Sequence, residues 1–107
     1  MKGAVNMYEG RPVDMQMERM ILDEGFFDPT IYQCEIITYK PEEERIYLLS
    51  KRTELPVFSL DGIYRCTIAA EEGLVECSGS ITERYWNKLG RVMVFRLRNG
   101  FYKKVVN

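Results

Sequence analysis

The feature that most constrains the fold is the alternation of apolar and polar residues from Ile63 to the C-terminus. Short turn-forming stretches divide this region into segments of strand length. The last divider is Asn99-Gly100, and both residues of such a pair tolerate the positive φ that a tight β-hairpin turn requires. The pattern therefore predicts a four-stranded antiparallel meander, whose final two strands meet at Asn99-Gly100.

A register follows if the turns of this meander span residues 70–73 and 85–89, because apolar residues then gather on one face. The predicted cross-strand partners are Cys66 with Cys77, Ile81 with Met93, and Gly79 with Phe95. Together with the hairpin described next, this face supplies the predicted core: Ile36, Ile46, Leu48, Tyr64, Cys66, Ile68, Val75, Cys77, Ile81, Met93, Phe95 and Leu97.

The N-terminal half is less regular. Residues 31–39 and 45–50 are rich in Ile and Tyr and flank the polar stretch KPEEER, which predicts a hairpin. Residues 13–24 fit two patterns. Helical spacing is shown by Val13, Met17, Met20, Ile21 and Glu24, whereas residues 13–18 also alternate as in a half-buried strand. The pattern alone slightly favours the helix.

Charge is unevenly distributed along the chain. Residues 1–83 carry a net charge of −8, whereas residues 84–107 carry seven basic residues and no acidic residue. Such a split indicates either a local positive field or two halves that interleave in space and neutralise each other.

Three basic residues are candidates for an anion-binding face. In the predicted register Arg96 lies opposite Lys103 across the Asn99-Gly100 turn, and Arg65 lies one strand away beside Ser78. Like charges placed opposite each other are unfavourable unless an anion lies between them. A structural alternative is that exposed basic residues protect a sheet edge against aggregation. Arg98 is expected to pair with Glu76 instead.

Tyr85-Trp86-Asn87-Lys88 forms a second candidate site, because it places an aromatic residue beside a cation on a predicted loop. Trp is among the residues that dominate the energetics of protein interfaces. Tyr85, Trp86 and Lys88 are therefore the predicted protein contact. The alternative is that Trp86 folds back and covers one end of the domain.

Residues for most enzyme chemistries are missing. The chain contains no histidine, no CxxC pair and no glycine-rich phosphate loop. We expect no catalytic residue, no metal site and no cofactor. Cys66 and Cys77 are expected to be core residues, and a redox role would require exposed thiols of lowered pKa.

The stretch from RPVDMQM through YQCEIITY, RIYLLSK and LDGIYRCTI to GRVMVFRL resembles the N-terminal barrel domain of flagellar-brake proteins. Those bacterial proteins join this barrel to a PilZ domain that binds cyclic di-GMP. The resemblance covers residues 11–98 and implies a strand, not a helix, over 13–20. The dinucleotide signature RxxxR with [DN]xSxxG is absent, so direct cyclic di-GMP binding is not expected.

We therefore expect residues 1–107 to form one mainly β domain, a small antiparallel barrel of six to seven strands with residues 1–10 poorly ordered. The expected function is that of a non-catalytic, PilZ-like accessory barrel in bacterial signalling, which acts by protein contact. The alternative is nucleic-acid or nucleotide binding through a basic sheet face, which would also use Tyr102 and Trp86. No signal or membrane-spanning segment is recognisable, so we expect a cytoplasmic location.

Overall fold

The computed structural model describes residues 8–20, 27–71 and 73–103. Within these ranges the chain forms six strands and two single-turn 3₁₀ helices, and no α-helix. The elements are β1 (Pro12–Met20), β2 (Ile31–Lys40), η1 (Pro41–Glu43), β3 (Arg45–Ser50), η2 (Leu55–Val57), β4 (Gly62–Ala70), β5 (Gly73–Asn87) and β6 (Gly90–Lys103).

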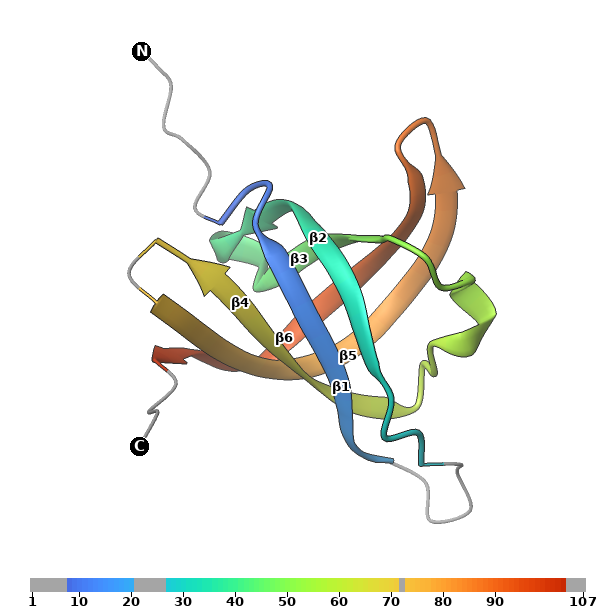
Figure 1. Cartoon of the computed structure of the whole chain (residues 1–107), viewed down its shortest axis with the longest axis horizontal. Helices are drawn as coiled ribbons and strands as arrows, with labels where there is room; N and C mark the ends of the chain where they lie inside the picture. Colours follow the sequence, from blue (N-terminus) through green and yellow to red (C-terminus); the bar gives the residue numbers. More distant parts are fainter. Residues whose placement is uncertain (1–7, 21–26, 72, 104–107) are drawn as a thin grey trace.

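The six strands form one antiparallel sheet that closes into a barrel in the order β1-β2-β3-β6-β5-β4 (Figure 1). Four pairs of consecutive strands form hairpins: β1 with β2, β2 with β3, β4 with β5, and β5 with β6. The two remaining pairings join β3 to β6 and β1 to β4, and together they close the ring. Closure gives the strands of a small sheet two neighbours each and encloses one core. The predicted fold class, a mainly β domain built as a small barrel, is thus confirmed with six strands.

Side chains that point into the barrel form its core, and all twelve predicted core residues are buried. Alternation of the strands explains this result, since every second residue faces inward. The core also contains residues that the prediction did not include: Val13, Met15, Met17, Cys34, Leu55 and Phe58.

β1 resolves the ambiguity of the N-terminal segment in favour of the strand. Val13, Met15 and Met17 are buried, whereas Asp14 and Glu18 are exposed. The two-residue alternation is therefore the period that the barrel uses, and the helical spacing of the methionines was coincidental. Residues 21–24 of the proposed helix lie outside the described residues.

The predicted turn at Asn99-Gly100 is wrong. β6 runs without interruption from Gly90 to Lys103, so the C-terminal meander has three strands instead of four. Gly100 is not among the glycines with positive φ, which a turn of the expected type would require. The physical reason is that β5 is fifteen residues long and can pair with β6 as far as Val75↔Lys103.

The predicted register is right between β4 and β5 and wrong between β5 and β6. Cys66 lies opposite Cys77, as expected. Ile81, however, lies opposite Phe95, because the turn between β5 and β6 spans only Lys88 and Leu89 instead of residues 85–89. An irregularity between Ile81 and Glu83 also shifts the pairing. The other corrected pairs are Gly79 with Leu97 and Glu76 with Tyr102, so Glu76 does not face Arg98.

The connector between β3 and β4 closes one end of the barrel. Its residues Leu55 and Phe58 are buried, and the Phe58 ring lies edge-on to Tyr32 with 5.0 Å between ring centroids. The hydroxyl of buried Tyr64 accepts a hydrogen bond of 2.9 Å from the Ser59 amide. These contacts with core residues fix the position of the connector at the end of the barrel.

An aromatic cluster lies apart from this connector. Phe101 packs against Tyr8 and Tyr39, with ring centroids 5.0 and 4.9 Å away respectively. Tyr8 belongs to the turn 8–10 that precedes β1, so part of the segment expected to be poorly ordered is described, while residues 1–7 lie outside the described residues.

Candidate interaction surface

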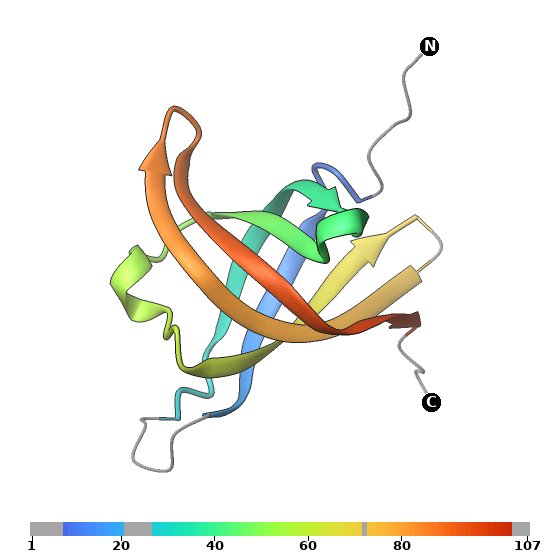
Figure 2. The same ribbon diagram turned by 180° about the vertical axis from the view of Figure 1, so that it is seen from behind.

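β5 and β6 extend past the body of the barrel as a two-stranded projection, here called the hairpin arm (residues 83–92) (Figures 1 and 2). β4 pairs with β5 only as far as Ser80, and β3 pairs with β6 only from Val92 to Arg96. Beyond those points β5 and β6 still pair with each other, ending at Asn87↔Gly90. The arm is therefore ordered by its own ladder and lacks a second neighbour over most of its length among the described residues.

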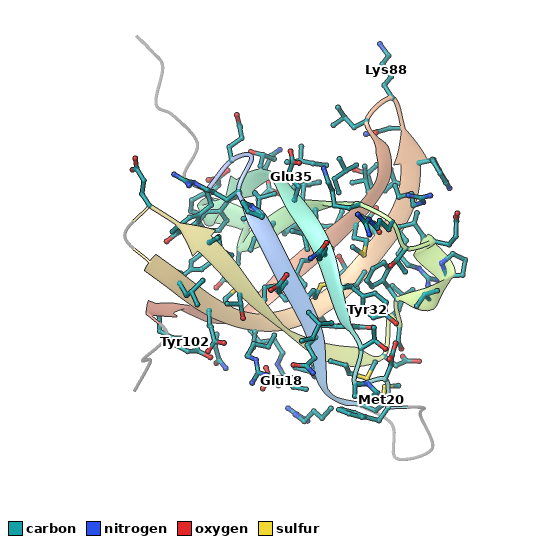
Figure 3. All side chains as sticks on the ribbon, viewed as in Figure 1. Glu18, Met20, Tyr32, Glu35, Lys88 and Tyr102 are labelled. Atoms are coloured by element: carbon teal, nitrogen blue, oxygen red, sulfur yellow. The ribbon has the colours of Figure 1, made fainter. Side chains whose placement is uncertain are left out.

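The tip of the arm is a two-residue turn made by Lys88 and Leu89. Gly90 closes it with a φ of +125°, a conformation that other residues rarely adopt. The Asn87 side-chain oxygen accepts a 2.8 Å hydrogen bond from the Leu89 amide. Figure 3 shows Lys88 extending from this tip away from the barrel.

Two arginines anchor one face of the arm to the connector beneath it. Arg84 donates from Nη1 to the carbonyl oxygens of Leu55 and Phe58, at 3.3 and 2.6 Å. Arg91 donates to the Glu54 carboxylate at 3.2 Å. Because the connector itself is buried at Leu55 and Phe58, these contacts hold the arm at a fixed angle to the barrel.

Trp86 lies on this anchored face but is not covered by it. Its side chain stacks against Arg91, whose guanidinium carbon is 5.4 Å from the ring centroid. Trp86 nevertheless remains 63% exposed, and Leu89 at the tip is 58% exposed. The alternative that Trp86 closes the end of the barrel is therefore wrong, since Leu55 and Phe58 fill that position.

The opposite face of the arm continues onto the outside of the barrel and carries a shallow groove of about 170 Å³. Val92 lies in the groove and is buried beneath its neighbours. The residues that line the groove are Ile37, Thr38, Lys40, Tyr47, Tyr85, Asn87, Leu89 and Val92. Lys40 is the only charged residue among them, and its ammonium lies 5.4 Å from the centroid of the Tyr47 ring.

A row of basic residues crosses the outside of the barrel below this groove. The pairing places Lys40 opposite Arg45, and Arg45 opposite Arg96, on three adjacent strands. All three point outward, because Ile46 and Phe95 beside them point into the core. Within the described part of the chain, Arg45 forms one ion pair, to Glu43 at 3.5 Å, and its Nε atom is buried without a hydrogen-bond partner.

The three predicted anion-binding residues do not come together. Arg65 lies on β4, where it contacts Glu76 at 3.7 Å and the Gln16 side chain at 3.2 Å. Arg96 faces Ser80, and β5 separates it from Arg65. The backbone of Lys103 pairs with Val75, far along β6, and its side chain lies outside the described residues. The register error at Asn99-Gly100 caused this wrong grouping.

The predicted contact residues Tyr85, Trp86 and Lys88 do share the hairpin arm, although Tyr85 lies on the groove face and Trp86 on the anchored face. Sequence reasoning missed Lys40, Arg45 and Tyr47. KPEEER indicates only a polar connection within a hairpin, and the pairing of β3 with β6 is non-local, so no sequence signal places Arg45 beside Arg96.

The three thiols are buried inside the barrel and unoxidised. Burial raises the pKa of Cys34 to about 12 and raises the pKa of Cys66 as well. Thiols of this kind remain protonated near neutral pH and are weak nucleophiles. The expectation that Cys66 and Cys77 are core residues is therefore confirmed, and Cys34 is a further buried thiol.

Comparison with known proteins adds no assignment: no family model, no curated protein and no solved structure matches this chain. The resemblance to flagellar-brake barrels stays a prediction. Across the residues that the structure describes, no group of three or more His, Cys, Asp or Glu side chains could hold a metal ion. In the same part of the chain, no helix has the length and apolar character needed to cross a membrane.

Proposed function

We propose that this barrel is a non-catalytic protein-interaction module that binds a protein partner through the hairpin arm. The observation that supports the proposal most strongly is the exposure of Trp86 and Leu89 on an arm that Arg84 and Arg91 hold in place. A rigidly presented aromatic residue loses little conformational entropy on binding and is a typical interface anchor. The setting that we propose is bacterial signalling of the cyclic di-GMP type, in the cytoplasm, with the barrel as a PilZ-like accessory domain.

The proposal is tested by isolating the partner from cells of the source organism with the tagged protein and measuring its affinity for purified variants. We expect Trp86→Ser and Leu89→Ser each to weaken binding at least about tenfold, as hot-spot truncations do. Ile31→Ser and Leu74→Ser are matched controls, because Ile31 and Leu74 are exposed apolar residues outside the arm. Equal loss from arm and control variants, or no loss from the arm variants, would disprove the proposal.

A second candidate function is nucleotide or nucleic-acid binding on the outside of the barrel. The row Lys40, Arg45 and Arg96 favours it, since three cations in register form a local positive field. Such binding must weaken steeply as salt rises. Titration of the protein with single-stranded DNA, single-stranded RNA and cyclic di-GMP near 0.15 M salt tests it, with Arg96→Glu as the control. We expect no binding of any of the three.

A further inference from the structure

We infer that the groove and the basic row together form one docking surface for an extended peptide segment of the partner, in which an apolar side chain and a carboxylate lie about four residues apart. This inference rests on the proposed function and names the chemistry of the partner. The surface lies on the outside of β2, β3, β6 and the groove face of the arm, here called the docking face.

The upper end of the docking face accepts an apolar side chain. Tyr47 and Tyr85 border the groove, and Val92 lies within it. Leu89, more than half exposed at the tip, extends the apolar border outward. An apolar side chain that enters this groove loses contact with water on several sides, which is the source of the favourable free energy.

The lower end of the docking face requires negative charge. Lys40, Arg45 and Arg96 lie directly opposite one another on adjacent strands, an arrangement that is unfavourable without a neutralising group. Glu43 pairs only with Arg45, and no ion pair is found for Arg96 or Lys40 among the described residues. Arg98, two residues further along β6, is also exposed and adds to the positive charge.

Acidic residues border this face without filling it. Glu42 and Glu44 are exposed in the turn that joins β2 to β3, at one end of the basic row. Glu83 lies opposite Val94 on the β5 side. Arg96, at the β6 end of the row, has no ion pair among the described residues and therefore retains the positive field toward which a partner carboxylate would be attracted.

The spacing between the two ends follows from strand geometry. Val92 at the groove and Arg96 in the row lie four residues apart on β6, which corresponds to about 13 Å at about 3.3 Å per residue. An extended segment lying along β6 covers the same distance in four residues. The geometry thus sets the separation between the apolar and the acidic residue of the partner.

A peptide fits this face better than a nucleic acid does. The Lys40 ammonium lies over the Tyr47 ring, so the groove and the basic row share a side chain and form a continuous surface. Phosphates alone would leave the apolar groove unused, and the exposed acids at 42, 44 and 83 would repel a polyanion. A segment with one apolar and one acidic side chain satisfies both ends.

The inference is tested by selecting peptides that bind the purified chain of residues 1–107 from a random displayed library of octamers. We expect enrichment of sequences in which an apolar residue lies three to five positions from Asp or Glu, in one consistent order. A synthetic peptide from the selection is then titrated against variants. Arg96→Glu should lower its affinity about tenfold or more, because like charges then meet at the row. Tyr47→Ala should also lower the affinity, because it removes a side chain that lines the groove.

Matched controls are available on the same barrel. Arg19→Glu reverses an exposed charge on β1, which lies three strands away from β6 around the ring, and should leave the affinity unchanged. Tyr102→Ala removes an exposed ring of β6 that lies at the opposite end of the molecule from Lys88 (Figure 3) and should also be neutral. Thermal melting of each variant shows that the fold is retained.

A further experiment exchanges the charges of the protein and the peptide. A peptide with Lys in place of its acidic residue should bind Arg96→Glu better than it binds the wild type. Absence of enrichment, enrichment without an acidic position, or equal losses from Arg96→Glu and Arg19→Glu would each overturn the inference. Binding of a single-stranded oligonucleotide that Arg96→Glu abolishes would overturn it in favour of a nucleic acid.

Different results would disprove the inference and the proposed function. A partner whose binding depends on Trp86 and Leu89 but not on Arg96 or Tyr47 supports the arm as a contact and disproves the docking face. A partner that is insensitive to Trp86 and Leu89 disproves the proposed function, whatever the peptide selection shows.

Discussion

Gly79 on β5 lies so close to the Arg96 carbonyl oxygen on β6 that a Cβ atom at Gly79 would be 2.0 Å from it. No real Cβ atom makes a contact this short with backbone, so β6 would have to move. Arg96 belongs both to this contact and to the basic row of the docking face. The position of the row thus depends on a glycine that is buried behind it.

Gly79→Ala is therefore expected to be severely destabilising, by about 3 kcal/mol or more, because the steric conflict is with backbone and cannot be relieved by a side-chain rotation. Gly100→Ala is the matched control. No atom lies within 4 Å of the Cβ that it would add, and Gly100 does not require a positive φ. The control should change the free energy of unfolding by less than about 0.5 kcal/mol. Urea unfolding curves of the two variants measure both effects.

The control is informative in its own right. If Asn99-Gly100 formed a tight hairpin turn, Gly100→Ala would strain it and lower stability clearly. A large loss in Gly100→Ala would therefore contradict the continuous β6 strand and restore the four-stranded meander that the dipeptide predicts.

Alkaline pH should destabilise the barrel through its thiols. A raised folded-state pKa means that the folded protein keeps a proton that the unfolded chain releases, so stability is lost as pH rises above the unfolded value. For Cys34 this window runs from about 9 to about 12. Within it the free energy of unfolding should fall by up to about 1.4 kcal/mol per pH unit for this thiol. Denaturant midpoints measured in steps of pH test the slope, and Cys34→Ala should reduce it.

The same thiols should resist modification in the folded state. All three cysteines are at most 2% exposed, and Cys66 and Cys77 face each other inside the barrel. An aromatic disulfide reagent at pH 8 should react slowly with the native protein and quickly with all three thiols in guanidinium chloride. Fast reaction of a thiol in the native protein would contradict the closed barrel.

Arg84→Ala should loosen the arm without unfolding the barrel. Its guanidinium makes two hydrogen bonds to carbonyl oxygens of the connector, and Arg84 is exposed, so we expect a loss of about 1 kcal/mol. Hydrogen exchange of the amides in 83–92 should accelerate, while that of β1 and β2 stays unchanged. Glu83→Ala, which removes a neighbouring charge with no described ion pair, is the control and should accelerate neither region.

Trp86 provides a direct optical test of the arm, because it is the only tryptophan in the chain. Because Trp86 is 63% exposed, its fluorescence should be quenched readily by acrylamide in the native protein. Trp86→Ser should change the free energy of unfolding by less than about 0.5 kcal/mol. A native fluorescence shielded from acrylamide, or a marked loss of stability, would show that Trp86 is part of the core.

The core could be predicted from sequence because it depends on local alternation. Each strand identifies its own inward face, and the pairing of Cys66 with Cys77 needed only a short turn between adjacent strands. The strand over 13–20 required more than pattern, since methionines at 17 and 20 satisfy a helix equally well. Its alternation became decisive only when β2 and β4 provided partners on both sides.

The candidate site was predictable only in part. Trp86 and Lys88 were found because an aromatic residue next to a cation near a turn is a local signal. The basic row was not, because Arg45 and Arg96 are separated by fifty residues of sequence and meet through the non-local pairing of β3 with β6. The strong preference of Asn-Gly for turns further misplaced the final residues, since tertiary pairing with a long β5 overrode that preference.

The hairpin arm also has a consequence for solubility. Ring closure pairs the main-chain amides within the barrel. Beyond Ser80, however, the outer edge of β5 has no strand beside it in the described part of the chain, so another extended chain could pair there. This edge carries charges of both signs, at Glu83, Arg84 and Lys88. Charged residues at a strand edge oppose the non-specific pairing of one copy of the protein with another. The protein therefore has an exposed strand edge in the hairpin arm, and the charged side chains along it limit aggregation through that edge.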